Sequence, residues 1–272
     1  MLFKIWAFVF GRSIFRIFNY LMFQLSLRGM GIYNYSSHYL SGENWLIKKK
    51  IKKIGNQLVI FDVGANNGDF TKLIIESGVS IAAIYAFEPH PNTFVRLEKN
   101  LASNNFVRPI QLALSSHKGN DFLYDRLDFK GSGSAHASLS DSIFSQVYKI
   151  ERTKVKIKKE TLDNFCEENS ISNIDFLKID TEGNEFEVLK GSSKMLNNRK
   201  IKVIQFEFTQ LNSTIGIFFK QFYDLLSEHY DIYRLLPNGI VKIKNYDATV
   251  CEIFAYQNFV AILKEDKVDK ND

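Results

Sequence analysis

The stretch Val59-Ile-Phe-Asp-Val-Gly-Ala-Asn-Asn-Gly-Asp-Phe70 decides the fold of this chain. It begins as an apolar run, which predicts a buried strand, and then breaks at two glycines, Gly64 and Gly68. Gly64 allows a tight turn, and Gly68 lets a helix begin close to a ligand without a Cβ in the way. The first N–H groups of that helix would face an anionic group. Because the same pattern also occurs where nothing binds, the rest of the chain must decide its meaning.

Beyond this stretch, apolar runs alternate with helical patterns. This alternation predicts βαβ units and a parallel sheet with helices on both faces, an α/β fold. The expected strands are residues 57–63, 81–87, 107–114, 174–180 and 202–208. The expected helices are residues 70–77, 92–104, 185–198 and 217–229.

Two regions depart from this rhythm. Residues 121–157 alternate polar and apolar side chains around Gly131-Ser-Gly-Ser134, which predicts an inserted hairpin or edge strand. After His229, three strand-like segments at 231–236, 240–244 and 253–263 include the turn Pro237-Asn-Gly239. We therefore expect the sheet to finish with antiparallel strands.

A carboxylate, Glu88, follows the second expected strand and would lie at the same sheet edge as the glycine turn. Such an acid can accept hydrogen bonds from both hydroxyls of a ribose, which indicates a nucleoside ligand. An NAD fingerprint beginning at Gly64 would need glycine at positions 66 and 69, where Asn66 and Asp69 stand. Asp62, just before the turn, suits a ligand with a positive amino group, and S-adenosylmethionine is such a ligand.

Composition sets broad limits on the class of protein. The chain has 272 residues, 45% of them hydrophobic, which is enough for a full core. Its net charge of +5 is concentrated in the first 42 residues, which hold Lys4, Arg12, Arg16 and Arg28 but no acid. The remaining body is near neutral and has no Pro-Pro signature, so we expect no nucleic-acid substrate. Its two cysteines, far apart in the chain, suit a reducing cytoplasm.

The N-terminal segment is aromatic-rich and basic, and it is predicted to be helical. Charged and polar residues interrupt it too often for a transmembrane span or a cleaved signal peptide. It could pack on the core or on a second subunit, or residues 1–28 could lie on an anionic bilayer at the inner face of the membrane. We divide the chain into this segment at 1–45, a main domain at 46–263 and a charged tail at 264–272.

At this point a family resemblance becomes specific. Five motifs follow in the order and spacing of the FkbM-type S-adenosylmethionine-dependent methyltransferases: residues 61–68, 86–91, 113–115, 161–163 and 177–183. The run Lys-Ile-Asp-x-Glu-Gly-x-Glu at 178–185 is the most specific of them. The resemblance implies a class I, Rossmann-like three-layer sandwich with a seven-stranded, mostly parallel sheet whose last strand is antiparallel. It also implies methyl transfer to a hydroxyl of a sugar, polyketide or other small metabolite.

The resemblance also implies positions for the cofactor. The turn Gly64-Ala65-Asn66-Asn67-Gly68 would hold its methionine part, with Asp62 orienting the ammonium group directly or through water, and Glu88, followed by Pro89, would clamp the ribose. Leu114 and Ser115 would lie near the adenine. Asp62 and Ser115 could instead satisfy loop N–H groups.

The chemistry is expected at the end of the fourth strand. Asp180 would emerge beside the transferred methyl group, Glu182 and Glu185 follow it, and Glu207 ends the next strand. Without an internal Lys or Arg, these carboxylates would raise one another's pKa so that one accepts the hydroxyl proton, or they would bind a divalent cation. We rank the metal-free base first. His136 is a second candidate base or substrate contact.

The sequence therefore predicts an O-methyltransferase for a small-molecule or glycan hydroxyl, including a surface polysaccharide precursor. The alternatives are an NAD(P)-dependent oxidoreductase, which the missing glycines disfavour, and a non-catalytic nucleoside-binding module, which Asp180, Glu182 and Glu88 disfavour. The acceptor and the oligomeric state stay open.

Overall fold

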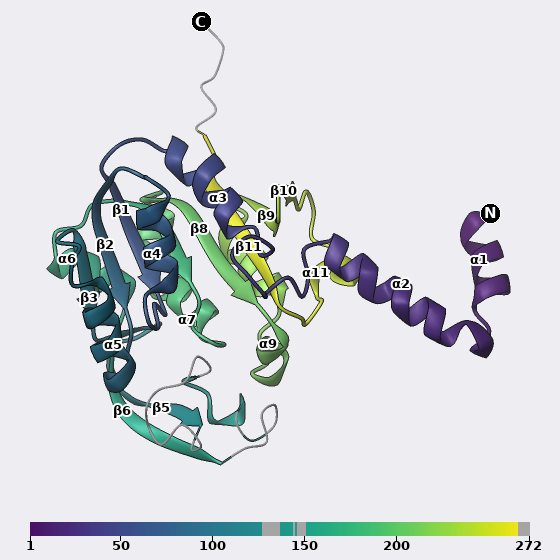
Figure 1. Cartoon of the computed structure of the whole chain (residues 1–272), viewed down its shortest axis with the longest axis horizontal. Coiled ribbons are helices and arrows are strands. Elements are labelled where there is room, and N and C mark those ends of the chain that lie inside the picture. Colours follow the sequence, from purple (N-terminus) through teal and green to yellow (C-terminus); the bar gives the residue numbers. More distant parts are fainter. Residues whose placement is uncertain (127–136, 144, 146–150, 266–272) are drawn as a thin grey trace, which may run out of the picture.

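The computed structural model describes residues 1–126, 137–143, 145 and 151–265, and its centre is a mostly parallel sheet (Figure 1). In the described residues this sheet has eight strands in the order β10-β9-β11-β8-β7-β1-β2-β3. They are β1 (Leu58–Val63), β2 (Ile81–Phe87), β3 (Val107–Ile110), β7 (Ile174–Ile179), β8 (Ile201–Phe208), β9 (Tyr230–Leu236), β10 (Gly239–Lys242) and β11 (Gln257–Leu263).

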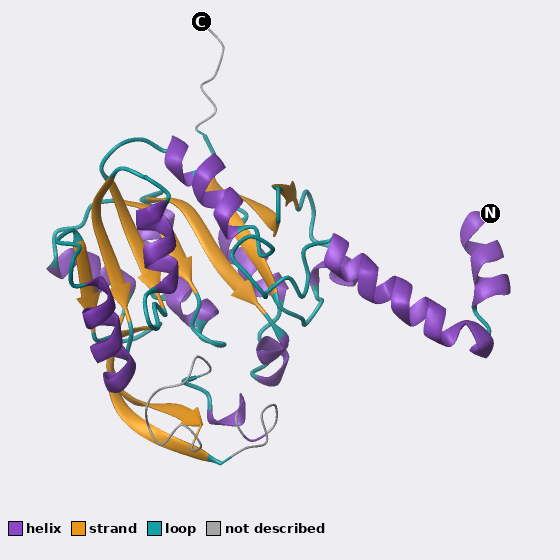
Figure 2. Ribbon diagram, viewed as in Figure 1, coloured by secondary structure: helices purple, strands orange, loops and turns teal. Residues whose placement is uncertain are grey.

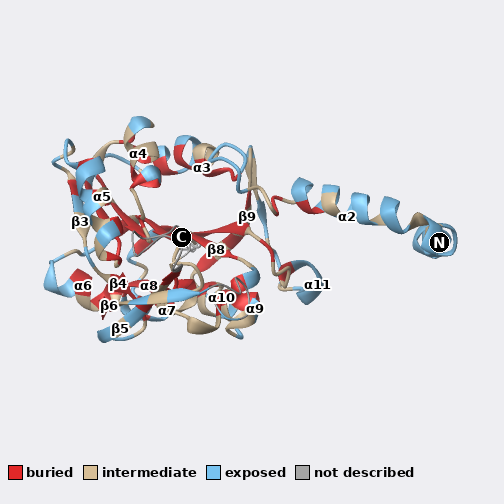
Figure 3. Ribbon diagram, turned by 60° about the horizontal axis from the view of Figure 1, so that its bottom comes forward, coloured by how far each residue is buried: buried red, intermediate tan, exposed pale blue. Residues whose placement is uncertain are grey.

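Helices cover both faces of the sheet, and a hydrophobic core lies under each layer (Figures 2 and 3). One layer consists of α3 (Glu43–Lys49), η2 (Ile51–Lys53), α4 (Asp69–Glu76) and α5 (Pro91–Leu101). The opposite layer consists of α6 (Leu162–Glu168), α7 (Glu185–Lys190), α8 (Ser193–Asn197) and α10 (Phe219–Leu226). The short helices α9 (Gln210–Thr214) and α11 (Ala248–Cys251) lie outside these two layers. The predicted three-layer α/β sandwich is confirmed.

The third expected strand is not continuous. Residues 107–110 form β3 beside β2, but β4 (Ala113–Leu114) pairs with β6 (Arg152–Glu160) in a second sheet. A tight turn, closed by the hydrogen bond from Leu112 N to Ile110 O at 3.0 Å, separates the two. The prediction of one strand was wrong because the partner of β4 comes from a segment about 45 residues further along the chain.

The helix expected at 185–198 is also divided, at Gly191. A Cβ on Gly191 would lie 2.0 Å from the Ser115 carbonyl oxygen, so the backbone passes too close to the neighbouring loop for a regular helix. Asp163 then caps the new helix α8, accepting hydrogen bonds from Lys194 N at 2.7 Å and Met195 N at 2.9 Å. Asp163, part of one family motif, is therefore a structural residue.

The inserted hairpin and the antiparallel finish are present. β5 (Gly119–Arg126) pairs antiparallel with β6, in the sheet order β4-β6-β5. β9 and β10 form a hairpin at Pro237-Asn238, and β11 runs antiparallel between β8 and β9. β10 adds an eighth strand to the seven expected. The strand expected from Ile253 begins at Gln257. Residues 253–256 form a turn instead, closed by the hydrogen bond from Ala255 N to Ile253 O.

The N-terminal segment extends away from the body (Figures 1 and 3). It contains α1 (Leu2–Phe10), the 3₁₀ turn η1 (Ser13–Phe15) and α2 (Arg16–Gly29), and Leu27 is the buried residue of these helices. Packing along the core, one of the two expectations for this segment, therefore holds only for its last turn. Among the described helices, none is long and apolar enough to cross a membrane.

Buried phenylalanines hold α10 against the sheet. Phe222 of α10 is fully buried and stacks on Phe206 of β8, with ring centroids 4.9 Å apart and an interplanar angle of 3°. Phe219 packs on Phe259 of β11 at 4.3 Å. Packed rings combine a large buried area with specific geometry. This cluster therefore contributes strongly to the stability of the carboxyl end of β8, on which the site described below depends.

We expect Phe222→Ala to lower the free energy of unfolding by about 3–5 kcal/mol, because it leaves a cavity of a whole ring in a packed core. Phe218→Ala is the matched control: that ring is 51% exposed, and its loss should cost under about 1.5 kcal/mol. Urea unfolding of both variants measures the two values. Equal losses would contradict the importance of this cluster.

Candidate functional site

The glycine turn after β1 is held on both sides. Gly64 N and Ala65 N donate hydrogen bonds to Phe87 O at 3.0 and 2.9 Å, which joins the turn to the end of β2. Gly64 has a φ of +84°, and a Cβ there would lie 1.7 Å from the Asp180 carbonyl oxygen. A residue with a Cβ would not fit this close contact. Glycine at position 64 therefore allows the loops after β1 and β7 to come together.

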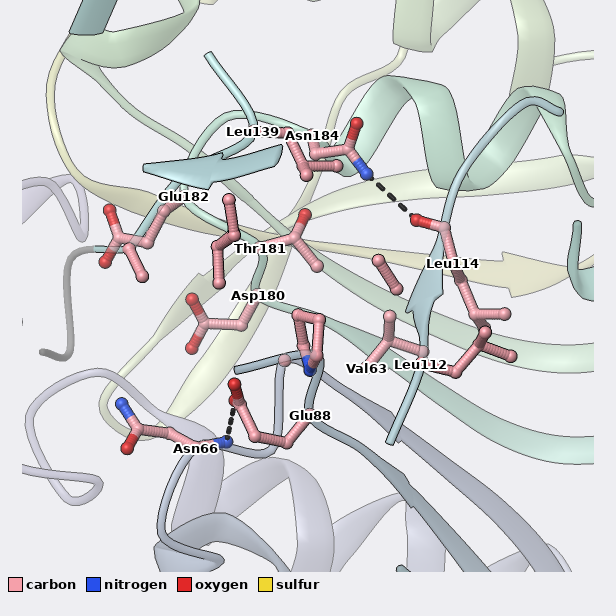
Figure 4. A pocket seen from close by; sticks show the side chains of 15 residues that line it. Val63, Asn66, Glu88, Leu112, Leu114, Leu139, Asp180, Thr181, Glu182 and Asn184 are labelled. Atoms are coloured by element: carbon pink, nitrogen blue, oxygen red, sulfur yellow. Dashed lines mark hydrogen bonds between the residues drawn. The ribbon is translucent and has the colours of Figure 1, made fainter. Parts of the chain in front are cut away.

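Glu88 closes the other side of the turn. Its carboxylate accepts a hydrogen bond from Asn66 N at 3.1 Å (Figure 4). It also accepts one from His90 N at 2.8 Å. Burial raises the pKa of Glu88 to about 7, although these two hydrogen bonds oppose the rise. The group therefore titrates near neutral pH, and one side of it faces a cavity.

That cavity, which we call the β2 cavity, lies where the carboxyl ends of β1, β2 and β7 meet. Leu112, Leu114, Val63 and Pro89 give it apolar walls, and Asp180, Thr181 and Glu182 lie across from them (Figure 4). Asn184 donates to Leu114 O at 2.9 Å and fixes that wall. Leu123, Ala137 and Leu139, from the inserted region, complete the lining.

Most of the residues predicted for the cofactor meet here. Gly64, Asn66, Glu88, Pro89, Leu114 and Asp180 all line the β2 cavity. Five others, namely Asp62, Ala65, Asn67, Gly68 and Ser115, do not line it. Asn67 accepts from Arg96 at 2.9 Å, Gly68 begins α4 against Leu97 and Leu101, Ala65 is buried, and Ser115 is buried with its N–H bonded to Glu160 O. The predicted candidate His136 lies outside the described residues.

Asp62 lies beneath the turn and is fully buried. Thr71 Oγ1 donates to its Oδ2 at 2.6 Å, whereas within the described part of the chain Oδ1 has no hydrogen-bond partner. Burial raises the pKa of Asp62, and the positive charge of Lys178 opposes that rise. A buried carboxylate oxygen without a donor fits a site that is completed by a cationic ligand group or water.

Lys178 is the main residue that the sequence reasoning missed. Its Nζ is buried and lies 2.7 Å from Asp180 Oδ2. Burial alone would lower the pKa of Lys178, but the carboxylates of Asp180, Asp62 and Glu43 raise it above its usual value. The expectation of carboxylates without an internal basic partner was therefore wrong. A lysine inside the apolar run Phe176-Leu-Lys-Ile179 was the available signal.

Glu185 shapes the loop between β7 and α7. It accepts hydrogen bonds from Thr181 N at 2.9 Å and Gly183 N at 3.1 Å, and burial raises its pKa to about 7. Glu182 has the left-handed φ of +52°, and its carbonyl accepts from Ser138 Oγ at 2.7 Å. The loop is thus held from inside by Glu185 and from the insertion by Ser138, while the Glu182 side chain faces the cavities.

A second cavity, the β8 cavity, opens at the ends of β7 and β8. Glu207, Thr209 and Gln210 line one side. Burial raises the pKa of Glu207 well above its usual value, and the negative charge of Asp180 raises it further. The β8 cavity and the β2 cavity share four lining residues, namely Gly64, Asn66, Asp180 and Glu182.

The N-terminal segment supplies the opposite wall of the β8 cavity. Tyr33 and Tyr35 line it together with Tyr256, whose ring centroid lies 5.6 Å from that of Tyr35. Tyr33 N donates to Tyr256 O at 2.8 Å. Local sequence gave no signal for these tyrosines, because only the return of residues 33–35 to the body brings them to β11.

Glu43 ties this segment to the site from below. It is 5% exposed and accepts hydrogen bonds from Ser41 Oγ at 3.0 Å and Gln205 Nε2 at 3.0 Å, and it bonds to His38. Burial would raise the pKa of Glu43, but the bond from His38 and the charge of Lys178 hold it below its usual value. Among the described residues no group of three or more His, Cys, Asp or Glu is arranged to hold a metal ion.

The sheet order, the glycine turn after β1 and the acid after β2 define a Rossmann-like protein with a cavity at the carboxyl ends of its strands. The model of the methyltransferase FkbM domain matches residues 62–238, more than half of the chain. The chain therefore belongs to the FkbM methyltransferase domain family, as its sequence motifs predicted.

Curated relatives are similar over this region. The chain is 28% identical over 167 residues to the hexuronic acid methyltransferase AglP of Haloferax volcanii, covering 61% of this chain and 63% of AglP. It is 27% identical over 164 residues to the 2-O-methyltransferase NoeI of Sinorhizobium fredii, covering 56% of this chain and 65% of NoeI. The chain thus spans less than two thirds of the length of each of these relatives.

Solved structures give a weaker likeness. A crystal structure of a methyltransferase FkbM from Methylobacillus flagellatus aligns with a TM-score of 0.46 at 11% identity, covering 75% of this chain and 43% of that one.

Gly64→Ala should lower the free energy of unfolding by more than about 3 kcal/mol, because the new Cβ would overlap the Asp180 carbonyl oxygen and the backbone must move. Gly216→Ala is the control that separates the steric overlap from the cost of a left-handed backbone. Gly216 has a φ of +70° with open space around it, so only the backbone cost, about 1 kcal/mol, remains. Urea unfolding measures both variants. Similar losses would show that the contact with Asp180 is unimportant.

Proposed function

We propose that this chain is an S-adenosylmethionine-dependent O-methyltransferase that modifies a hydroxyl of a glycan precursor or small metabolite. The observation that carries the proposal is the boundary of the two cavities, where Gly64, Asn66, Asp180 and Glu182 face both. A cofactor in the β2 cavity and an acceptor in the β8 cavity would meet at this boundary. Methyl transfer needs such an in-line meeting of two bound molecules.

The residues of the β2 cavity fit the proposed cofactor. Glu88 offers a carboxylate to ribose hydroxyls, and the apolar wall of Pro89, Leu112 and Leu114 suits a flat base. Beneath the turn and outside this lining, Asp62 Oδ1 has no hydrogen-bond partner among the described residues, which suits a water that links it to an ammonium group. Asp180 would face the positively charged end of the cofactor. When bound, S-adenosylmethionine supplies a methyl group on a positive sulfonium.

The chain itself must accept the proton that the acceptor hydroxyl loses. Asp180 is paired with Lys178, which fixes its position. Glu207 lines the acceptor side, and its raised pKa makes its carboxylate a stronger base. We therefore assign Glu207 as the group that accepts the hydroxyl proton. Asp180 and Glu182 have positioning roles at the boundary of the two cavities, and the proposed mechanism uses no divalent cation.

Support for a sugar acceptor comes from the relatives and from the cavity. AglP is named for hexuronic acid and NoeI for 2-O-methylation. Tyr33, Tyr35 and Tyr256 give the β8 cavity aromatic faces beside the polar side chains of Glu207, Thr209 and Gln210. Aromatic faces combined with hydrogen-bonding groups suit a sugar ring.

We further propose that residues 46–263 form the catalytic domain, that residues 1–45 are its attached segment and that 264–272 are a charged tail. The protein would work in the cytoplasm, at the inner face of the membrane, with contact through residues 1–28. The exposed apolar side chains of that segment support this location.

Calorimetric titration with S-adenosylhomocysteine tests the cofactor, with NAD(H) as the parallel ligand. We expect micromolar binding that strengthens by about tenfold as the pH rises from about 6 to 8, because Glu88 must lose its proton, with a pKa of about 7, before it can accept from a ribose. Glu88→Gln should weaken binding and remove this pH dependence. Saturable binding of NAD(H) without binding of S-adenosylhomocysteine would instead support the oxidoreductase alternative.

Glu207→Gln should lower the rate of methyl transfer by about 10²–10⁴-fold, because the proton acceptor is lost, and should leave S-adenosylhomocysteine affinity within about twofold. The assay follows label from methyl-labelled S-adenosylmethionine into glycan precursors. Glu228→Gln, at a side chain that is 80% exposed, is the matched control and should keep full activity. Binding without turnover in the wild-type chain would support the non-catalytic alternative.

A turnover rate that is unaffected in Glu207→Gln would remove Glu207 as the base. Asp180→Asn then tests the other carboxylate: it removes the 2.7 Å ion pair with Lys178 and should reduce both affinity and rate.

A further inference from the structure

Residues 2–25 form an apolar arm that the body does not cover. Its exposed fractions are far above those of core residues: Phe3 is 87% exposed, Ile14 81%, Ile17 75% and Phe8 74%. Leu2, Ile5, Trp6, Tyr20, Leu21, Met22, Phe23 and Leu25 are also exposed by at least two fifths. A continuous apolar surface of this kind marks a contact with a protein or a membrane.

The arm has a defined corner between α1 and α2. Trp6 stacks on Phe10 with ring centroids 4.3 Å apart, and Phe10 packs on Phe18 at 5.6 Å. Asn19 Nδ2 donates to Phe10 O at 2.7 Å. The two helices therefore meet at an angle (Figure 1), and their lengths of 9 and 14 residues correspond to only about 14 and 21 Å. Neither spans the hydrocarbon core of a bilayer, about 30 Å thick, but both can lie in its interface.

Charge selects the occupant of this surface. The arm carries Lys4, Arg12 and Arg16, Arg28 follows it, and no acid occurs in the first 42 residues. Two such arms would repel each other, which disfavours a dimer through this surface. An anionic bilayer attracts each basic side chain, and Trp and Tyr side chains are favoured at the interface.

The residues that follow the arm form one wall of the β8 cavity, which would take the acceptor. Leu27, Ile32 and Ala255 form a small buried cluster that fastens α2 to the segment before β11. Six residues after Leu27 the chain reaches Tyr33, which lines the β8 cavity. The surface that would lie on the bilayer and the cavity that would take the acceptor are thus joined through one short, anchored connection.

From this connection we infer that the arm lies in the interface of an anionic bilayer and that the acceptor is a glycan carried on a membrane lipid. The inference rests on the proposed function, since it names the substrate class of the same site. A hydroxyl presented at the bilayer surface would reach the β8 cavity without leaving the membrane. Lys4, Arg12 and Arg16 would contact lipid phosphates while the exposed phenylalanines and isoleucines enter the acyl boundary.

The first test measures binding of the full chain to vesicles of phosphatidylcholine with 30% phosphatidylglycerol, and to phosphatidylcholine vesicles alone, in a flotation assay. We expect binding to the anionic vesicles, reduced at least tenfold in Phe8→Glu/Ile17→Glu. Val95→Glu/Val241→Glu is the matched control, with the same change of charge at side chains 62% and 56% exposed on the body. Equal binding of both variants, or no binding of the wild type to anionic vesicles, would overturn the inference.

The second test follows methyl-labelled S-adenosylmethionine with total membranes of the organism that makes the protein. Label in the lipid fraction extracted with organic solvent, at least tenfold lower for Phe8→Glu/Ile17→Glu than for the control variant, would support a lipid-carried acceptor. Label confined to water-soluble glycans, at equal rates for both variants, would overturn it.

Calorimetry with S-adenosylhomocysteine distinguishes failure of the inference from failure of the proposed function. Both double variants should bind S-adenosylhomocysteine as the wild type does, because the substituted residues do not line the β2 cavity. A wild-type chain that binds vesicles but not S-adenosylhomocysteine would overturn the proposed function and the acceptor with it.

Discussion

The buried ammonium of Lys178 is the interaction on which the site depends. A charge removed from water is costly unless partners surround it, and here carboxylates from three parts of the chain do so: Asp180 after β7, Asp62 at the end of β1 and Glu43 from α3. The Phe70 ring, 4.7 Å from Nζ, covers the amine from α4. One side chain of β7 thereby fixes the relative positions of the turn, the β7 loop and the N-terminal segment.

The same ion cluster makes the two cavity-facing carboxylates different. Asp180 lies against Lys178 at 2.7 Å. Burial and the negative charge of Asp180 raise the pKa of Glu207, and the positive charge of Lys178 opposes that rise. Lys178 is therefore more than a structural counter-ion, because its charge acts on both of these cavity-lining carboxylates.

The sequence predicted what depends on local pattern. The strands β1, β2, β7 and β8 and the residues at their carboxyl ends followed from apolar runs and turn residues, because parallel strands bring those ends to one edge. The divided strand at 107–114 and the break at Gly191 depend on contacts with β6 and Ser115, which lie far away in the chain. The tyrosines were missed for the same reason, because an aromatic wall built from distant segments has no local signature. Lys178 had a local signal, its place in an apolar run, but its carboxylate partners come from three parts of the chain.

The N-terminal segment contributes to the site as well as extending away from the body. Tyr33 and Tyr35 line the β8 cavity, and Glu43 belongs to the cluster around Lys178, so a deletion of residues 1–42 would open that cavity and leave Glu43 without His38. Loss of function in such a deletion could not be assigned to membrane contact. The buried cluster of Leu27 marks the physical boundary instead, because the two tyrosines and Glu43 all follow it in the chain. Substitutions confined to residues 2–25 therefore change the surface of the arm while the β8 cavity keeps its walls.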